Sequence, residues 1–162
     1  MRNPSCQRVQ HPGDVMLSDI DLDSYDYSAL TAARFFFSAF ASPQSEPWLS
    51  MVIGSDHLFP GVQSAETMRR LLTVVHEMRL ARKSVMRFSN PTCPCCAEIL
   101  TEEERHLVQT LQAVRDGRKS RAASSAMLLC EGHDTAEFLS AVARFCAHMP
   151  ARIKSAGMVT FP

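Results

Sequence analysis

The stretch CPCCAEILTEEERHLVQTLQAV, residues 93–114, decides how the C-terminal half of this 162-residue chain is interpreted. Its first four residues contain a Cys-x-x-Cys pair, which places two thiols on one tight turn, and Pro94 makes that turn rigid. Thr101 and Glu104 then predict a capping box, in which each side chain satisfies a free backbone N–H at a helix start. The stretch therefore predicts a metal-binding turn followed at once by an amphipathic helix.

A second pair of possible ligands repeats this arrangement further along the chain. Cys130 and His133 lie on a predicted turn, and Asp134 and Glu137 predict another capping box directly after it. A tetrahedral zinc site needs four such sulfur and nitrogen ligands. The predicted ligands of one zinc ion are Cys93, Cys96, Cys130 and His133.

The two pairs are separated by more residues than in classical zinc fingers. Two predicted helices, residues 100–114 and 119–130, fill this separation as an antiparallel hairpin whose two ends the zinc would tie together. The paired turns resemble the knuckles of zinc ribbons and treble clefs over these few residues only. The long helical insert departs from both patterns, so no family is assigned.

Other assignments of the ligands stay open. Cys95 can replace Cys93 or Cys96, because adjacent cysteines leave the choice between them loose. Cys146 and His148 form an alternative second pair, although neither lies on a predicted turn. The spacing of Cys146 favours a core position.

The composition predicts one globular domain, since 46% of the residues are hydrophobic and 21% are charged. We expect a mainly α-helical domain over residues 27–150, with the zinc-tied hairpin in its C-terminal part, residues 88–150. Residues 1–26 are rich in Asp and predict a flexible acidic arm, and residues 151–162 predict a frayed tail. Repeated Pro and Gly in residues 42–61 predict a loop, with residues 48–53 as a short extended element.

Residues 64–88 predict a long helix with an apolar stripe and several basic side chains. The stripe includes Leu72 and Val85, and Ser64 is the expected cap. Residues 1–66 carry three basic and eight acidic side chains, whereas the rest of the chain carries fourteen and nine. This asymmetry makes the basic helix the expected contact with a protein or a nucleic acid. The predicted contact residues are Arg69, Arg70, Arg79, Arg82, Lys83 and Arg87.

Several classes of protein and location are disfavoured by the sequence. The six glycines form no nucleotide-binding loop, and no catalytic motif of a known type is visible. No secretory signal and no membrane span is predicted, so we expect a cytoplasmic protein whose cysteines bind metal or react as thiols.

The function expected from these features is that of a small zinc-binding regulatory or adaptor protein, with transcription regulation as one setting. A thiol-based redox sensor that uses Cys93, Cys95 and Cys96 is the alternative. An enzyme with catalytic zinc is the least favoured hypothesis, because shells rich in cysteine more often mark structural sites.

Overall fold

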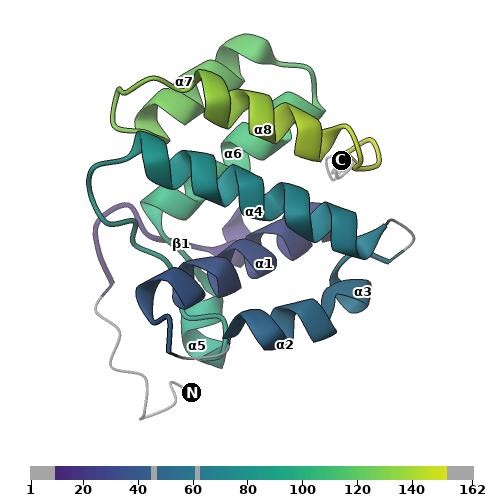
Figure 1. Ribbon diagram of the computed structural model, residues 1–162. Helices are drawn as coiled ribbons and strands as arrows, with labels where there is room; N and C mark the ends of the chain where they lie inside the picture. Colours follow the sequence, from purple (N-terminus) through teal and green to yellow (C-terminus); the bar gives the residue numbers. More distant parts are fainter. Residues whose placement is uncertain (1–9, 45–46, 61–62, 153–162) are drawn as a thin grey trace, which may run out of the picture.

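The computed structural model describes residues 10–44, 47–60 and 63–152, and this part of the chain is mainly helical, as the sequence predicts (Figure 1). In chain order the elements are β1 (Val15–Met16), the 3-10 helix η1 (Leu17–Asp19), α1 (Ser24–Ala41), α2 (Pro47–Ile53), α3 (Ser55–Leu58), α4 (Ser64–Ala81), α5 (Pro94–Ala97), β2 (Ile99–Leu100), α6 (Glu102–Arg115), α7 (Lys119–Leu129) and α8 (Ala136–Cys146). Residues 1–9 of the predicted arm and 153–162 of the predicted tail lie outside the described residues. Within the described ranges, no helix is both long and apolar enough to cross a bilayer.

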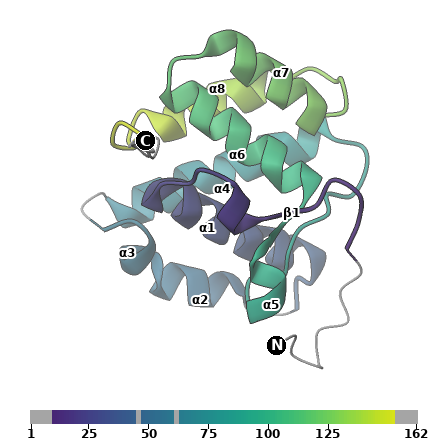
Figure 2. The same ribbon diagram turned by 180° about the vertical axis from the view of Figure 1, so that it is seen from behind.

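The main core lies among α1, α4, α6 and α8. Helix α4 packs on α1 and α8, and α6 packs on α1, α7 and α8. Figures 1 and 2 show α7 and α8 at one end of the molecule and α2 and α5 at the other. Apolar side chains at three- and four-residue spacing on these helices provide the buried surface that stabilises the fold. They include Ala33, Phe37, Leu71, Val75, Met78, Leu107, Leu111, Phe138, Val142 and Phe145.

The segment before α1 is held against the domain rather than projecting from it. In the antiparallel pair of β1 and β2, Val15 lies opposite Leu100 and Met16 lies opposite Ile99. Leu17 is buried in a small second cluster that also contains Leu100. This pairing brings residues from the predicted arm beside the segment that follows the cysteines.

Capping boxes are present at the starts of α1 and α6 but not at the start of α8. The predicted box of Thr101 and Glu104 is confirmed at the start of α6, and a similar box caps α1. The predicted box of Asp134 and Glu137 is wrong. Helix α8 begins at Ala136 after Thr135, so Asp134 lies one residue too early and only its carboxylate accepts a hydrogen bond from the Ala136 N–H, at 2.9 Å.

Two other predicted elements differ from the structure. Residues 48–53 belong to α2 and not to an extended piece, and the helix buries Met51 against the domain. The predicted helix 64–88 ends at Ala81, and Arg82 is extended. The backbone N–H groups of Lys83 and Ser84 then donate to the Glu131 carboxylate instead of continuing the helix.

One predicted stripe residue and the predicted cap of this helix also differ from the structure. Val85 lies beyond the helix and is 91% exposed, not buried. Ser64 is the first residue of α4 rather than its cap, and its hydroxyl donates to Asp56.

Candidate metal centre

The cysteine-rich turn brings three thiols together. Cys93 precedes α5, Pro94 begins it, and the Ala97 N–H closes the turn on the Cys93 carbonyl at 2.8 Å. The sulfurs of Cys93, Cys95 and Cys96 all lie within 4.8 Å of one another, and each side chain is half-buried. The Cys93 and Cys95 sulfurs are 3.4 Å apart.

These sulfur separations suit a thiolate-bound metal. A zinc ion about 2.3 Å from each sulfur holds tetrahedral sulfurs roughly 3.8 Å apart, so small side-chain rotations bring the group into position. Pro94 and the closed turn limit how far the backbone can spread. The cluster can therefore bind a metal with three protein ligands, and it leaves a fourth position open.

A buried arginine holds the segment that directly follows the cysteines in the sequence. Arg34 of α1 donates from Nη1 to the Ala97 carbonyl at 2.7 Å and from Nη2 to the Ile99 carbonyl at 2.6 Å. Its Nε also donates to Glu104 at 2.7 Å. The guanidinium thus ties α1 to both ends of the segment that leads from the thiols to α6.

Glu104 completes this support from the start of α6. Its carboxylate is fully buried and accepts hydrogen bonds from the backbone N–H groups of Ser89, at 3.0 Å, and Thr101, at 2.9 Å. A carboxylate buried with a guanidinium and two N–H donors is electrostatically satisfied. The segments before and after the thiols are consequently anchored to the same side chain.

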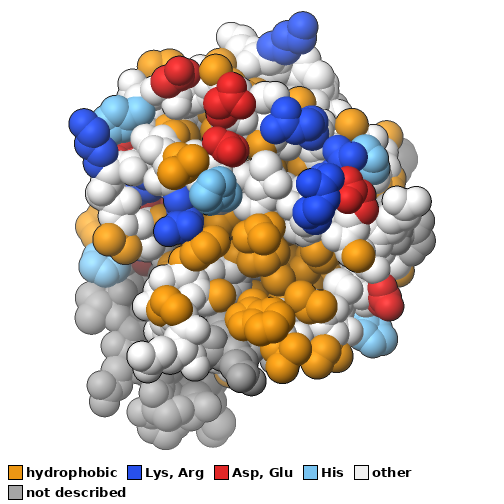
Figure 3. All heavy atoms as spheres, in the orientation of Figure 1, with side chains coloured by type: hydrophobic (Ala, Val, Ile, Leu, Met, Phe, Trp, Pro, Cys, Tyr) orange, Lys and Arg blue, Asp and Glu red, His pale blue; other side chains and the backbone are white. Residues whose placement is uncertain are grey.

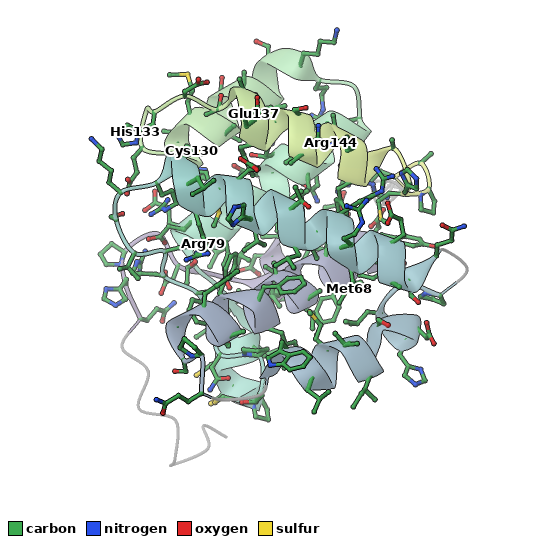
Figure 4. The ribbon with its side chains drawn as sticks, in the orientation of Figure 1. Met68, Arg79, Cys130, His133, Glu137 and Arg144 are labelled. Carbon is green, nitrogen blue, oxygen red and sulfur yellow. The ribbon has the colours of Figure 1, made fainter. Side chains whose placement is uncertain are left out.

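The structure does not bring the second predicted ligand pair to the first. Cys130 is buried in the main core at the end of α7, and desolvation raises the pKa of its thiol to about 11. The His133 ring nitrogen Nδ1 lies 3.0 Å from the Cys130 carbonyl oxygen. Figure 4 places both residues near the end of the molecule that carries α7, away from α5 in Figure 1. Neither belongs to the thiol group within 4.8 Å.

The alternative pair, Cys146 and His148, also lies outside the thiol group. Cys146 is buried, as its spacing predicts, and burial raises the pKa of its thiol to about 12. His148 is exposed beyond the end of α8. Neither residue belongs to the metal-binding group, whereas Cys95 does.

A histidine from the N-terminal segment shares a surface hollow with one of the three cysteines. His11 and Cys96 line one surface hollow of about 460 Å³, together with Asn90 and Thr101. His11 is exposed, and its backbone N–H donates to the Asp14 carboxylate at 3.1 Å. This shared hollow could not be predicted from the sequence, because the pairing of β1 with β2 creates it.

Most of the arginines predicted to contact a partner instead form ion pairs or hydrogen bonds within this chain. Arg69 and Arg70 share the Glu66 carboxylate, each at 2.7 Å. Arg82 donates to the Leu129 carbonyl and lies 3.3 Å from Glu131.

Arg87 also pairs within the molecule, with Glu103 at 3.0 Å and Asp14 at 3.4 Å. The other two basic residues of the predicted set have different surroundings. Arg79 lies 3.8 Å above the centre of the exposed Phe40 ring, and Lys83 is exposed. Arg79 and Lys83 are thus the more available cations of the predicted set.

Sequence reasoning missed Arg34 and Glu104 as supports of the thiol turn. One signal was present, since each is a charged residue on an otherwise apolar helical face, where an unpaired charge is costly. Their separation of 70 positions gave no indication that they pair.

Comparisons with models of protein families, with curated proteins and with solved structures found no match for this chain.

Proposed function

We propose that this chain is a small zinc-stabilised helical adaptor or regulatory protein, which binds another protein along the surface shared by α2 and α4. The observation that carries the proposal is an exposed apolar groove between these helices with arginines beside it. The thiol cluster provides the stabilising centre. Binding, rather than catalysis, is the proposed activity.

Zinc suits the cluster because soft thiolates favour it and cysteine-rich shells are typical of structural sites. The proposed ligands are Cys93, Cys95 and Cys96, with His11 in the fourth position across the shared hollow. A bound ion would link the N-terminal segment to α5. The Arg34 network would then hold the loaded turn against α1.

Elemental analysis of protein purified without a metal-binding tag tests the centre. We expect about one zinc per chain. Cys95→Ser should lose it, while Cys130→Ala should retain it, because Cys130 lies in the core. His11→Ala should weaken retention against a chelator. Loss of zinc in Cys130→Ala and His133→Ala, with retention in Cys95→Ser, would instead support the ligand set with both pairs.

The groove is a surface of unusual apolar character. Figure 3 shows hydrophobic side chains gathered over α2 and the adjoining parts of α1 and α4, with basic side chains above this patch in the view. Val52 and Ile53 of α2 are 53% and 74% exposed, and Trp48 also faces outward. A hollow of about 270 Å³ between α2 and α4 includes Met68 and Leu72 in its lining. Apolar patches of this kind mark binding surfaces.

The charges beside the groove favour an acidic partner. Arg69 lines the hollow, and the one Glu66 carboxylate is shared by Arg69 and Arg70, so these three side chains together carry one net positive charge. Figure 4 places Met68 and Arg79 toward opposite ends of α4. The proposed occupant is an amphipathic helix of another protein, with an apolar face and flanking carboxylates. A nucleic acid is a poorer match for this groove, because it would place charged phosphates against the apolar surface.

Trp48, the one tryptophan of the chain, is exposed on α2, the helix that forms one wall of the groove. The probes are tryptophan-free amphipathic peptides of about four helical turns, identical except for Glu or Lys flanking the apolar face. The Glu peptide should shift Trp48 emission to shorter wavelength and bind more tightly than the Lys peptide. Ile53→Glu should abolish binding, and Val85→Glu, an exposed change outside the groove, should preserve it.

Three results would overturn the docking assignment. Equal binding of both peptides would remove the role of charge. A dimer of the unmodified protein that Ile53→Glu dissociates would show that a second copy covers the groove. Tight binding of a DNA or RNA duplex that Arg79→Glu abolishes would assign the basic surface to nucleic acid.

Thiol redox sensing is a second candidate, and the 3.4 Å separation of the Cys93 and Cys95 sulfurs favours it. In this reaction hydrogen peroxide takes two electrons and two protons from the two thiols, a disulfide forms, and two waters leave. Metal-free protein that loses two hydrogens in mass under mild peroxide, with a reducible bond mapped to this turn, would support the sensor. Zinc-loaded protein that resists the same treatment would support the structural centre.

A further inference from the structure

A second hollow, on the side of α4 where that helix ends, has the features of a small-molecule site. It measures about 510 Å³, within the range of ligand pockets in proteins. Its walls come from the ends of α1 and α4 and from the chain between α4 and α5. Aromatic and apolar side chains form much of the lining: Phe37, Phe40, Ala41, Met78, Met86 and Phe88.

The polar part of the lining has one sign of charge. Arg79, Arg82 and Lys83 contribute, and no acidic residue is among the described lining residues. Glu131 faces this region from the α7–α8 connection, where it accepts bonds from Ser84 and the Lys83 N–H and pairs with Arg82. One carboxylate against three cations leaves the mouth positive.

One buried atom at this site lacks a partner. The Arg82 side chain is only 6% exposed, and its Nη1 and Nη2 make hydrogen bonds, but its Nε is buried without a hydrogen-bond partner. A buried N–H donor without an acceptor is costly. Arg79 lies over the Phe40 ring at the same mouth, which places a guanidinium where apolar wall meets solvent.

We infer that this hollow binds a free medium-chain carboxylate, with its alkyl chain against Phe37, Met78 and Phe88 and its carboxylate at Arg79, Arg82 and Lys83. The apolar walls provide the burial of the chain, and the cations select a negative head over a positive one. The site shares no lining residue with the groove between α2 and α4. It adjoins the hollow beside Cys96, which Met86 and Phe88 also line and Met78 does not.

Methionine methyl NMR distinguishes this site from the docking groove. Met78 and Met86 line the hollow, whereas Met51 and Met68 line the groove. The probe is decanoate below its micelle concentration. We expect saturable shifts of the Met78 and Met86 methyls, none of comparable size with acetate, and weak or no binding of decyltrimethylammonium.

Two variants test the parts of the site separately. Arg79→Gln combined with Lys83→Gln should weaken decanoate binding roughly tenfold, since each exposed charge contributes modestly. Ala41→Trp, an exposed change that fills the hollow, should abolish it. Arg69→Gln, on the same helix beside the groove, is the control and should bind normally.

The inference is overturned if decanoate and decyltrimethylammonium bind alike, or if Ala41→Trp binds decanoate unchanged. It is also overturned if the shifts fall on Met51 and Met68, which would place the alkyl chain in the docking groove. None of these outcomes depends on whether the acidic peptide binds.

Discussion

Arg34 and Glu104 are 70 positions apart in the sequence, yet their side chains meet at 2.7 Å in the interior of the protein. The arginine is 3% exposed and the glutamate is fully buried. This pair joins α1 to the start of α6, and its remaining donors hold the chain that carries the cysteines. The thiol turn is therefore positioned by a charge pair and not by apolar packing alone.

Removing one member of this pair should be severely destabilising. Arg34→Met leaves the Glu104 carboxylate buried without its counter-charge, which costs about 3–5 kcal/mol of unfolding free energy. Chemical denaturation measures the loss. Arg69→Met is the control, because its partner Glu66 lies at the surface, and its effect should be small. A similar small effect for Arg34→Met would contradict the role of the pair.

Thiol labelling should divide the cysteines into two classes. Burial raises the pKa of Cys130 to about 11 and that of Cys146 to about 12, so both stay protonated at neutral pH. After metal removal, iodoacetamide should modify the half-buried thiols of the 93–96 turn in the folded protein. Cys130 and Cys146 should react only in denaturant. Peptide mapping by mass spectrometry reads the result, and fast labelling of Cys130 in the folded state would disprove its burial.

Glu131 should contribute stability that acid removes. Hydrogen bonds from the Ser84 side chain and from the Lys83 and Ser84 N–H groups lower its pKa from 4.5 to about 2. A lowered folded-state pKa means that the stabilisation is complete above pH 4.5 and disappears as the pH falls toward 2.

The melting temperature of Glu131→Gln tests this. The variant should melt below the unmodified protein above pH 4.5, and the gap should close as the pH falls through this window. Glu137→Gln, an exposed change on α8, controls for the loss of one charge. A gap that widens in acid would reverse the predicted sign.

The two threonines that precede α6 and α8 should differ in their contributions. Thr101 accepts the Glu104 N–H at 3.1 Å and donates to the Arg87 carbonyl at 3.0 Å. Thr101→Ala should therefore cost about 1–2 kcal/mol. Thr135 occupies the corresponding position of α8 but makes no capping hydrogen bond with its side chain, so Thr135→Ala should change stability little. Denaturation midpoints at constant m-value compare them, and equal losses would contradict the capping argument.

The local features of this protein could be predicted from its amino-acid sequence. Helical spacing of apolar residues predicted the mainly helical class, and Thr101 with Glu104 predicted the start of α6, because a capping box acts within four residues. The grouping of thiols on the cysteine-rich turn could also be predicted, since these cysteines are neighbours in the sequence. Local chemistry of this kind needs no knowledge of the tertiary structure.

The contacts between groups far apart in the sequence became visible in the folded structure alone. It placed Cys130 in the core instead of beside Cys93, and it brought His11 to the hollow beside Cys96 through the β1–β2 pair. It also ended α4 at Ala81, because Glu131 captures the next backbone N–H groups. These outcomes depend on packing between helices far apart in sequence, where burial and charge pairing outweigh the short-range preferences that a linear pattern records.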